Sequence, residues 1–86
     1  MTQTDIHATI LNFFRQNIVF NDTWQIADDA SFLATGTLDS TGILELIGFL
    51  EQTYGVKFRD DELVATNFDS LGRVSAFMAE RLNGSH

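Results

Sequence analysis

The chain contains few side chains that could form a catalytic centre by themselves. It has no cysteine and two histidines, His7 near the start and His86 at the last position. A nucleophilic serine needs a base within hydrogen-bonding reach and a group that orients this base, and neither histidine is placed to complete such a set. No glycine-rich phosphate loop is present in the sequence. We therefore expect a protein that is not an enzyme.

The acidic residues suggest two further chemistries, and both are weakly supported. Residues 28–39 have the length of a calcium-binding loop, but Ala30 and Phe32 stand where oxygen ligands are needed. Carboxylates of the predicted second helix could act as a general acid and base, although a solvated helix face explains them as well. The sequence therefore predicts no metal site and leaves carboxylate catalysis as the least favoured alternative.

Ser40 is the remaining candidate for chemistry. It lies in the segment Gly-Thr-Leu-Asp-Ser-Thr-Gly-Ile-Leu-Glu-Leu (residues 36–46), between a long polar loop and an amphipathic helix with an acidic outer face. Asp39 and Ser40 are both residue types that commonly cap a helix N-terminus. Taken alone, the pair is therefore compatible with a purely structural role.

Three segments show the apolar spacing of helices, at every third or fourth position. They are residues 4–19, residues 40–54 and a last segment that Asp69 caps, and Asn21-Asp22 and Gly55 end the first two. The core-facing positions are Ile6, Ile10, Phe13, Phe14 and Ile18, then Ile43, Leu46, Ile47, Leu50 and Tyr54, and finally Leu71, Val74, Phe77, Met78 and Leu82.

The connecting segments complete the expected fold. Residues 20–39 show no period, and we expect a polar loop that is held by its apolar residues Trp24, Ile26, Phe32 and Leu33. Residues 56–58 are expected to form a loop, and residues 60–63 a short helical turn with acids at its start. The sequence thus predicts an all-α four-helix bundle with three long helices and one short helix. It forms a single domain over residues 1–82, followed by a frayed tail at 83–86.

The charge balance indicates which partners to expect. Twelve acidic residues against five basic ones give a net charge of −7, which disfavours nucleic acids and anionic membranes. Acidity that only aids solubility is equally compatible with this composition. The first residues lack a signal-peptide pattern, and no apolar run approaches the roughly 20 residues of a membrane span. We expect a cytoplasmic monomer whose partners are proteins with basic patches.

The segment around Ser40 resembles the phosphopantetheine attachment site of the acyl carrier protein family, which includes acyl and peptidyl carriers. The hallmark of the family is an Asp-Ser pair that opens the second helix of a four-helix bundle, here Asp39-Ser40. Residues 54–63 and 66–71 are similar to the family's segments around the short third helix and the entry to the last helix. The resemblance implies a carrier of acyl or aminoacyl thioesters on a 4'-phosphopantetheine arm, which comes from coenzyme A and is attached to Ser40.

Elementary electrostatics agrees with this resemblance. The phosphodiester of such an arm is an anion, and a helix N-terminus stabilises an anion by about 0.3–1 kcal/mol. Because Ser40 has no local base, a separate phosphopantetheinyl transferase must activate it, and the arm supplies the thiol that this chain lacks. Asp69-Ser70-Leu71 matches the family's usual Asp-Ser-Leu more literally. However, sixteen residues follow Ser70, so no recognition helix could come after it, and an N-terminal capping role at the last helix suits Ser70 or Asp69.

By resemblance, partner enzymes bind the second helix. The implied contact positions are Asp39, Ser40, Thr41, Leu44, Glu45, Gly48 and Glu51. Leu44 would supply an apolar contact, and the acids would mainly speed the encounter with basic patches. Thr41 and Arg59 stand where family members commonly have leucine and proline. The sequence is more similar to freestanding carriers that serve a dedicated acyl- or aminoacyl-activating ligase, and acyltransferases and synthases are other expected partners.

Two questions stay open from the sequence. A helical adaptor that carries no prosthetic group would bind its partner without needing Ser40, and this is the main alternative. Within the carrier family, roles in fatty acid, secondary metabolite or lipid-modifying pathways are all compatible with the sequence, since partner enzymes choose the cargo. The apolar core residues of the helices could also move apart to shelter a bound acyl chain.

Overall fold

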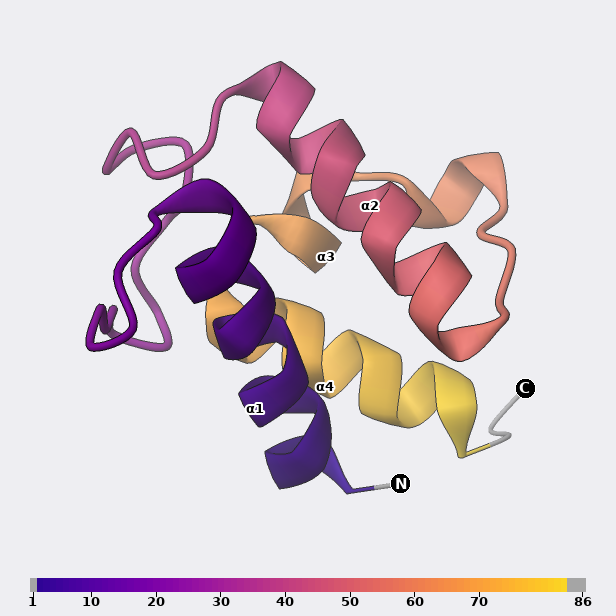
Figure 1. Ribbon diagram of the computed structural model, residues 1–86. Helices are drawn as coiled ribbons and strands as arrows, with labels where there is room; N and C mark the ends of the chain where they lie inside the picture. The colour runs from indigo at the N-terminus through magenta and orange to yellow at the C-terminus, as the bar shows by residue number, and fades with distance from the viewer. Residues whose placement is uncertain (1, 84–86) are drawn as a thin grey trace.

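The computed structural model describes residues 2–83, which form helices joined by loops, with no strand among them (Figure 1). The α-helices are α1 (Gln3–Phe13), α2 (Ser40–Tyr54), α3 (Ala65–Phe68) and α4 (Leu71–Leu82). A π-helical turn (Phe14–Ile18) extends α1, and a 3₁₀ turn (Asp60–Glu62) precedes α3. The predicted small all-α bundle is confirmed in this coarse form. Of the tail predicted to fray, residues 84–86 lie outside the described residues.

The first helix begins at a side-chain cap and ends in a widened turn. Thr2 Oγ1 accepts a hydrogen bond from Asp5 N at 3.1 Å, which satisfies one free N–H group of the first turn. At the other end, Val19 N donates to Phe14 O, five residues earlier, at 2.8 Å. Phe20 then adopts a φ of +56° and leaves its side chain 78% exposed. The helical segment therefore ends one residue before the predicted end at position 19.

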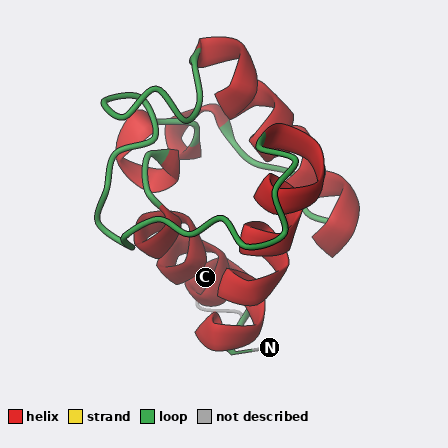
Figure 2. Ribbon diagram, turned by 60° about the vertical axis from the view of Figure 1, so that its left-hand side comes forward, coloured by secondary structure: helices red, strands yellow, loops and turns green. Residues whose placement is uncertain are grey.

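The long loop between α1 and α2 is held to the helices by hydrogen bonds. Arg15 Nε donates to Trp24 O at 2.8 Å, and His7 Nε2 lies 2.8 Å from Asp28 Oδ1. Gly72 N, at the start of α4, donates to Asp28 O at 2.9 Å. Figure 2 shows this loop and the other connections in green. These bonds give a segment without regular structure a defined course towards Ser40.

The apolar residues of this loop have different environments. Phe32 is completely buried, and Trp24 and Ile26 are half-buried, as the sequence predicts. Leu33 is 44% exposed, so the prediction that it helps to hold the loop to the core is wrong. The turn over residues 32–36 points Phe32 inwards and leaves its neighbour outside. Leu38, which was not predicted as a core residue, takes the second buried position, with 4% of its surface exposed.

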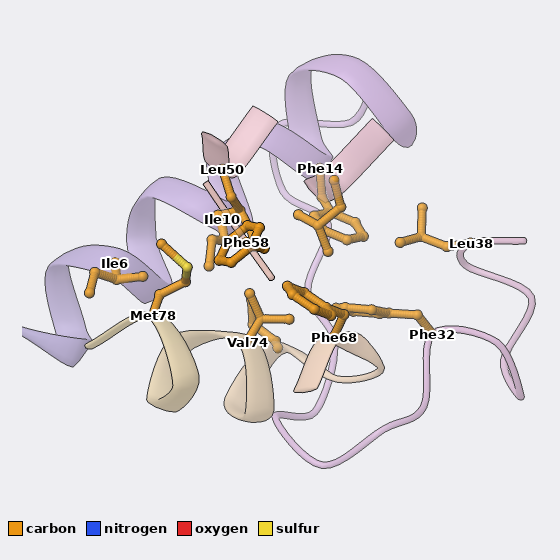
Figure 3. Close-up of a cluster of buried hydrophobic side chains, with 12 residues drawn as sticks. Ile6, Ile10, Phe14, Phe32, Leu38, Leu50, Phe58, Phe68, Val74 and Met78 are labelled. Carbon is orange, nitrogen blue, oxygen red and sulfur yellow. The ribbon is translucent and has the colours of Figure 1, made fainter. Parts of the chain in front are cut away.

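The core gathers side chains from the long helices, α3 and the connecting loops (Figure 3). Phe14 packs against Phe32 with ring centroids 4.8 Å apart, and Phe58 packs against Phe68 at 5.4 Å. Burying a side chain of this size contributes about 1.5–3 kcal/mol, so strong contacts join the π-helical turn to the long loop, and the segment after α2 to α3. The buried apolar residues are Ile6, Ile10, Phe14, Phe32, Leu38, Leu46, Leu50, Phe58, Phe68, Leu71, Val74 and Met78.

Glu62 fastens the segment between α2 and α3 to the last helix. It is only 8% exposed, and its carboxylate accepts hydrogen bonds from Arg59 N at 2.8 Å and Arg81 Nε at 3.1 Å. Arg81 also donates to Lys57 O at 2.9 Å. The short helical turn predicted at residues 60–63 is confirmed as the 3₁₀ turn, whereas α3 was not predicted from the sequence.

The helix ends confirm one prediction and correct another. The second helix starts at Ser40 and ends before Gly55, whose φ of +66° is left-handed, as the sequence predicts. The last helix, however, is capped by Ser70 and not by Asp69. Ser70 Oγ accepts a hydrogen bond from Arg73 N at 3.2 Å, while Asp69 closes the preceding helix α3. Both residue types cap helices well, so the sequence alone did not separate these neighbours.

Candidate functional site

Ser40 is the first residue of α2, and Asp39 is the N-cap residue before it. Asp39 has an extended backbone, and its Oδ1 accepts a hydrogen bond from Gly42 N at 2.7 Å. This bond starts the helix at Ser40 and leaves the N–H groups of Ser40 and Thr41 without a backbone acceptor among residues 2–83. The Ser40 side chain is exposed and makes no hydrogen bond within the same residues. The hydroxyl is therefore accessible at a helix N-terminus.

Gly42 lets the first turn of α2 lie directly on Leu38. Both residues are buried, and a Cβ at Gly42 would lie 2.8 Å from Leu38 Cδ2 and 3.4 Å from Asp39 Oδ1. Real Cβ atoms do not approach another atom this closely, so any larger residue here would require the Leu38 side chain to shift. Neither Leu38 nor Gly42 was predicted as a site residue. The glycine two positions after Ser40 was the one signal that could have found this contact.

Two hollows meet at Ser40. The first, the polar groove, has a volume of about 620 Å³ and is open to solvent. Its lining includes the polar side chains of Asn17, Thr37, Asp39 and Glu45 and the apolar ones of Ile18, Leu33 and Leu38. The second, the apolar pocket, has a volume of about 200 Å³ and lies between α2 and the segment that leads into α3. Besides Leu33 and Ser40, it is lined by Ile43, Ile47, Leu63, Val64, Ala65 and Phe68. A group attached to Ser40 Oγ therefore has a polar side and an apolar side available.

The outer face of α2 carries most of the predicted contact residues. Thr41, Leu44, Glu45 and Gly48 are all exposed, and Leu44 keeps 68% of its surface open to solvent. No atom lies within 4 Å of the position that a Cβ would take at Gly48. The structure thus brings these four residues together on one accessible face that begins at Ser40.

Glu51 differs from the other predicted contact residues. It is half-buried, and its Oε2 accepts a hydrogen bond from Phe58 N at 3.2 Å. The carboxylate therefore holds the chain that follows α2, which is a structural role. Its charge is less available to a partner than that of Glu45.

The competing Asp-Ser pair has a different environment. Ser70 is only 5% exposed, and its hydroxyl oxygen is used to cap α4. The carboxylate of Asp69 accepts hydrogen bonds from Ser31 Oγ at 2.5 Å and Leu33 N at 3.1 Å. Both members of this pair are thus occupied within the fold, in contrast to the free hydroxyl of Ser40.

The start of α2 carries acidic side chains and no basic ones. Asp39 and Glu45 line the polar groove, and no lysine or arginine lines either hollow in the part of the chain that the structure describes. Lys57 and Arg59 follow the opposite end of this 15-residue helix, about 20 Å away at 1.5 Å per residue. A hydrogen bond to Asp61 and the charge of this carboxylate raise the pKa of Arg59. The end of α2 at Ser40 is therefore acidic.

A comparison with known protein families and with curated proteins finds no match to this chain. Within residues 2–83, no helix is long and apolar enough to cross a membrane. The same residues include no group of three or more histidine, aspartate or glutamate side chains that could hold a metal ion. The geometry around Ser40 is therefore the basis on which a function can be argued.

Proposed function

We propose that this protein is an acyl carrier protein that carries its cargo as a thioester on a 4'-phosphopantetheine arm attached to Ser40. The observation that carries the proposal is the environment of Ser40, an exposed hydroxyl at the N-terminus of α2 where a polar groove and an apolar pocket meet. The all-α bundle and the Asp39-Ser40 pair agree with the family that the sequence resembles. Such a protein is a substrate of its partner enzymes and has no active site of its own.

The residues at the start of α2 fit the attachment chemistry. Ser40 Oγ would form a bond to the phosphorus nearest the pantetheine of coenzyme A, while the bond from this phosphorus to the oxygen of adenosine 3',5'-bisphosphate breaks. No histidine or carboxylate accepts a hydrogen bond from Ser40 within residues 2–83, so a base of the transferase must take the hydroxyl proton. The free N–H groups of Ser40 and Thr41 would then stabilise the phosphodiester anion. Once bound, the arm supplies the thiol that holds the acyl group.

The two hollows suit the two parts of such a cargo carrier. The polar groove can hold the amide-containing arm, because Asn17 in its lining keeps Oδ1 as an acceptor while its Nδ2 donates to Phe13 O at 3.2 Å. The apolar pocket can shelter part of an acyl chain, and each methylene group removed from water contributes about 0.8 kcal/mol. A cavity of about 150 Å³ is sufficient for benzene, so about 200 Å³ accommodates roughly six carbon atoms.

The partners of this carrier are enzymes that bind the exposed face of α2. A phosphopantetheinyl transferase would install the arm, and an acyl- or aminoacyl-activating ligase, an acyltransferase or a synthase would load and use the cargo. Leu44 offers the apolar contact. Asp39 and Glu45 would steer basic patches towards Ser40, an effect on association rate more than on affinity.

Intact-mass measurement tests the proposal. The wild type, Ser40→Ala and Ser70→Ala are incubated with coenzyme A and a broad-specificity phosphopantetheinyl transferase, and circular dichroism confirms that each variant is folded. We expect one phosphopantetheine group on the wild type and on Ser70→Ala, and none on Ser40→Ala. Modification that persists in Ser40→Ala would place the arm elsewhere.

A helical adaptor without a prosthetic group is the second candidate function. The favouring observation is the exposed face around Leu44 and Gly48, which could bind a partner without any modification of Ser40. Failure of the transferase to modify a folded wild-type protein would favour this alternative. Partner capture that is equal for the wild type and Ser40→Ala would then support it.

A further inference from the structure

Leu33 has a special position between the two hollows. Leu33 and Ser40 are the residues that line both the polar groove and the apolar pocket. The other residues around the apolar pocket come from α2, α3 and the segment before α3, so Leu33 is the single contribution of the long loop. Leu33 therefore lies where the two hollows adjoin, on the side where Ser40 lies.

Hydrogen bonds from Leu33 and from the neighbouring Phe32 fix the position of the Leu33 backbone. Asp69 Oδ1 accepts a hydrogen bond from Leu33 N at 3.1 Å, and Asp69 O accepts one from Phe32 N at 2.6 Å. Phe32 is completely buried against the core, and Leu38 N donates to Phe32 O at 3.1 Å, which closes the turn. The position of the Leu33 backbone is thus defined, although its side chain remains 44% exposed.

No core contact explains an exposed leucine at this place. A leucine whose side chain is almost half in water gains little from burial, and a polar residue would serve equally well in a surface turn. A leucine at position 33 instead adds apolar surface to the pocket, at the place where the pocket adjoins the polar groove. Leu33 therefore contributes to what the pocket can hold more than to the stability of the fold.

We propose that Leu33 is a specificity-determining residue, which lies between the apolar pocket and the polar groove and favours aliphatic acyl groups of about six carbon atoms as the sheltered cargo. This inference rests on the proposed carrier function of Ser40. Apart from Ser40, every side chain around the pocket is apolar. The ammonium group of an aminoacyl cargo would find no partner there, whereas an aliphatic chain would leave water. The volume of about 200 Å³ accommodates about six carbon atoms by comparison with a benzene-sized cavity.

The test measures how well the carrier protects its thioester. A broad-specificity transferase attaches hexanoyl- or acetyl-phosphopantetheine to Ser40 from the matching acyl-coenzyme A, and cleavage by hydroxylamine is followed by intact mass. Each rate is divided by the rate for the same acyl group on free pantetheine, which removes differences in intrinsic reactivity. We expect hexanoyl to be protected about tenfold in the wild type, which corresponds to a sheltered population of about 90%, and acetyl to be unprotected.

Three variants separate the role of Leu33 from general effects. Leu33→Ala should lose the protection of hexanoyl, and Leu33→Met should retain it, because methionine keeps the apolar volume. Leu44→Ala is the matched control, since Leu44 is an exposed leucine that lines neither hollow and should leave protection unchanged.

The possible results distinguish two failures. Equal protection in Leu33→Ala and the wild type, or an unprotected hexanoyl group in the wild type, would overturn the role of Leu33 while Ser40 remains the attachment site. A folded wild type that the transferase cannot modify would overturn the carrier function, and the specificity role of Leu33 with it.

Discussion

Asp69 and Leu33 are joined by a hydrogen bond across 36 positions of the chain, from Leu33 N to Asp69 Oδ1 at 3.1 Å. The second carboxylate oxygen of Asp69 accepts a hydrogen bond from Ser31 Oγ at 2.5 Å. One side chain at the junction of α3 and α4 thus holds the turn that borders both hollows at Ser40. The geometry of the candidate site therefore depends on a residue that lies far from it in the sequence.

Asp69→Ala should lower the free energy of unfolding by about 1–3 kcal/mol, because it removes the charged acceptor of two donors, the partly buried Ser31 Oγ and the exposed Leu33 N. Urea denaturation followed by circular dichroism measures the change. The control is Asp29→Ala, which removes an exposed carboxylate that makes no hydrogen bond within residues 2–83. Equal stability of the two variants would show that the Asp69 contacts contribute nothing.

The two glycines of α2 should respond to alanine in opposite directions. Gly42→Ala brings a Cβ to within 2.8 Å of Leu38 Cδ2, and overpacking of this kind costs about 1–3 kcal/mol. Gly48→Ala meets no atom within 4 Å and should stabilise the helix by about 0.5–1 kcal/mol, since alanine loses less backbone entropy than glycine. The midpoints of urea denaturation of the two variants give the comparison. A stabilising Gly42→Ala would mean that Leu38 can move aside at little cost.

The sequence predicts α2 well because all of its signals are local. The apolar positions of the helix repeat over residues 40–54, Asp39 supplies a cap, and Gly55 supplies the left-handed residue that ends it. The exposed face around Leu44 follows from the same period. These features need no knowledge of what lies across the fold, so the position of Ser40 at a helix start follows from the amino-acid sequence alone.

The remaining features depend on contacts between distant segments. No local pattern shows that Asp69 binds the loop residues Ser31 and Leu33, or that Leu38 packs under Gly42. The exposure of Leu33 beside the buried Phe32 follows from one loop turn, for which apolar periodicity provides no signal. The two hollows are formed by residues from several elements, and their presence therefore could not be predicted from the sequence.

The ion pair between Glu62 and Arg81 should contribute more to stability than the exposed pair between Arg59 and Asp61. Arg81→Met leaves the carboxylate of Glu62, which is 8% exposed, with only the Arg59 N–H as a donor. After allowance for the partly exposed guanidinium, we expect a loss of about 1–3 kcal/mol in the free energy of unfolding. Arg59→Met, the control, should cause no measurable loss because both partners of its ion pair are exposed.

A double-mutant cycle shows whether the Arg81 effect belongs to the pair. Glu62→Gln keeps an oxygen that can accept from Arg59 N, so it tests the charge of Glu62 with little change in shape. The losses from Glu62→Gln and Arg81→Met should be less than additive in the double variant. Additive losses would indicate that Arg81 acts through its hydrogen bond to Lys57 O instead.

Leu44→Glu should slow transferase-catalysed modification of Ser40 about tenfold, which equals about 1.4 kcal/mol, while leaving the fold intact. Leu44 is 68% exposed, so its replacement removes little buried surface from the free protein. In a complex, the same replacement exchanges an apolar contact for a carboxylate that would be desolvated. Rates are measured by intact mass at several carrier concentrations, and circular dichroism checks the fold.

The control for Leu44→Glu is Gln25→Glu, which adds the same charge at an exposed loop position outside α2. If both variants slow the transferase equally, net charge explains the effect and the outer face of α2 is not the docking surface. A lower rate of modification in Leu44→Glu alone supports an apolar contact between Leu44 and the transferase. Raising the salt concentration should then slow the modification of the wild type mainly by lowering its association rate with the transferase. The carboxylates of Asp39 and Glu45 act at a distance and are screened by salt, whereas Leu44 acts only on contact.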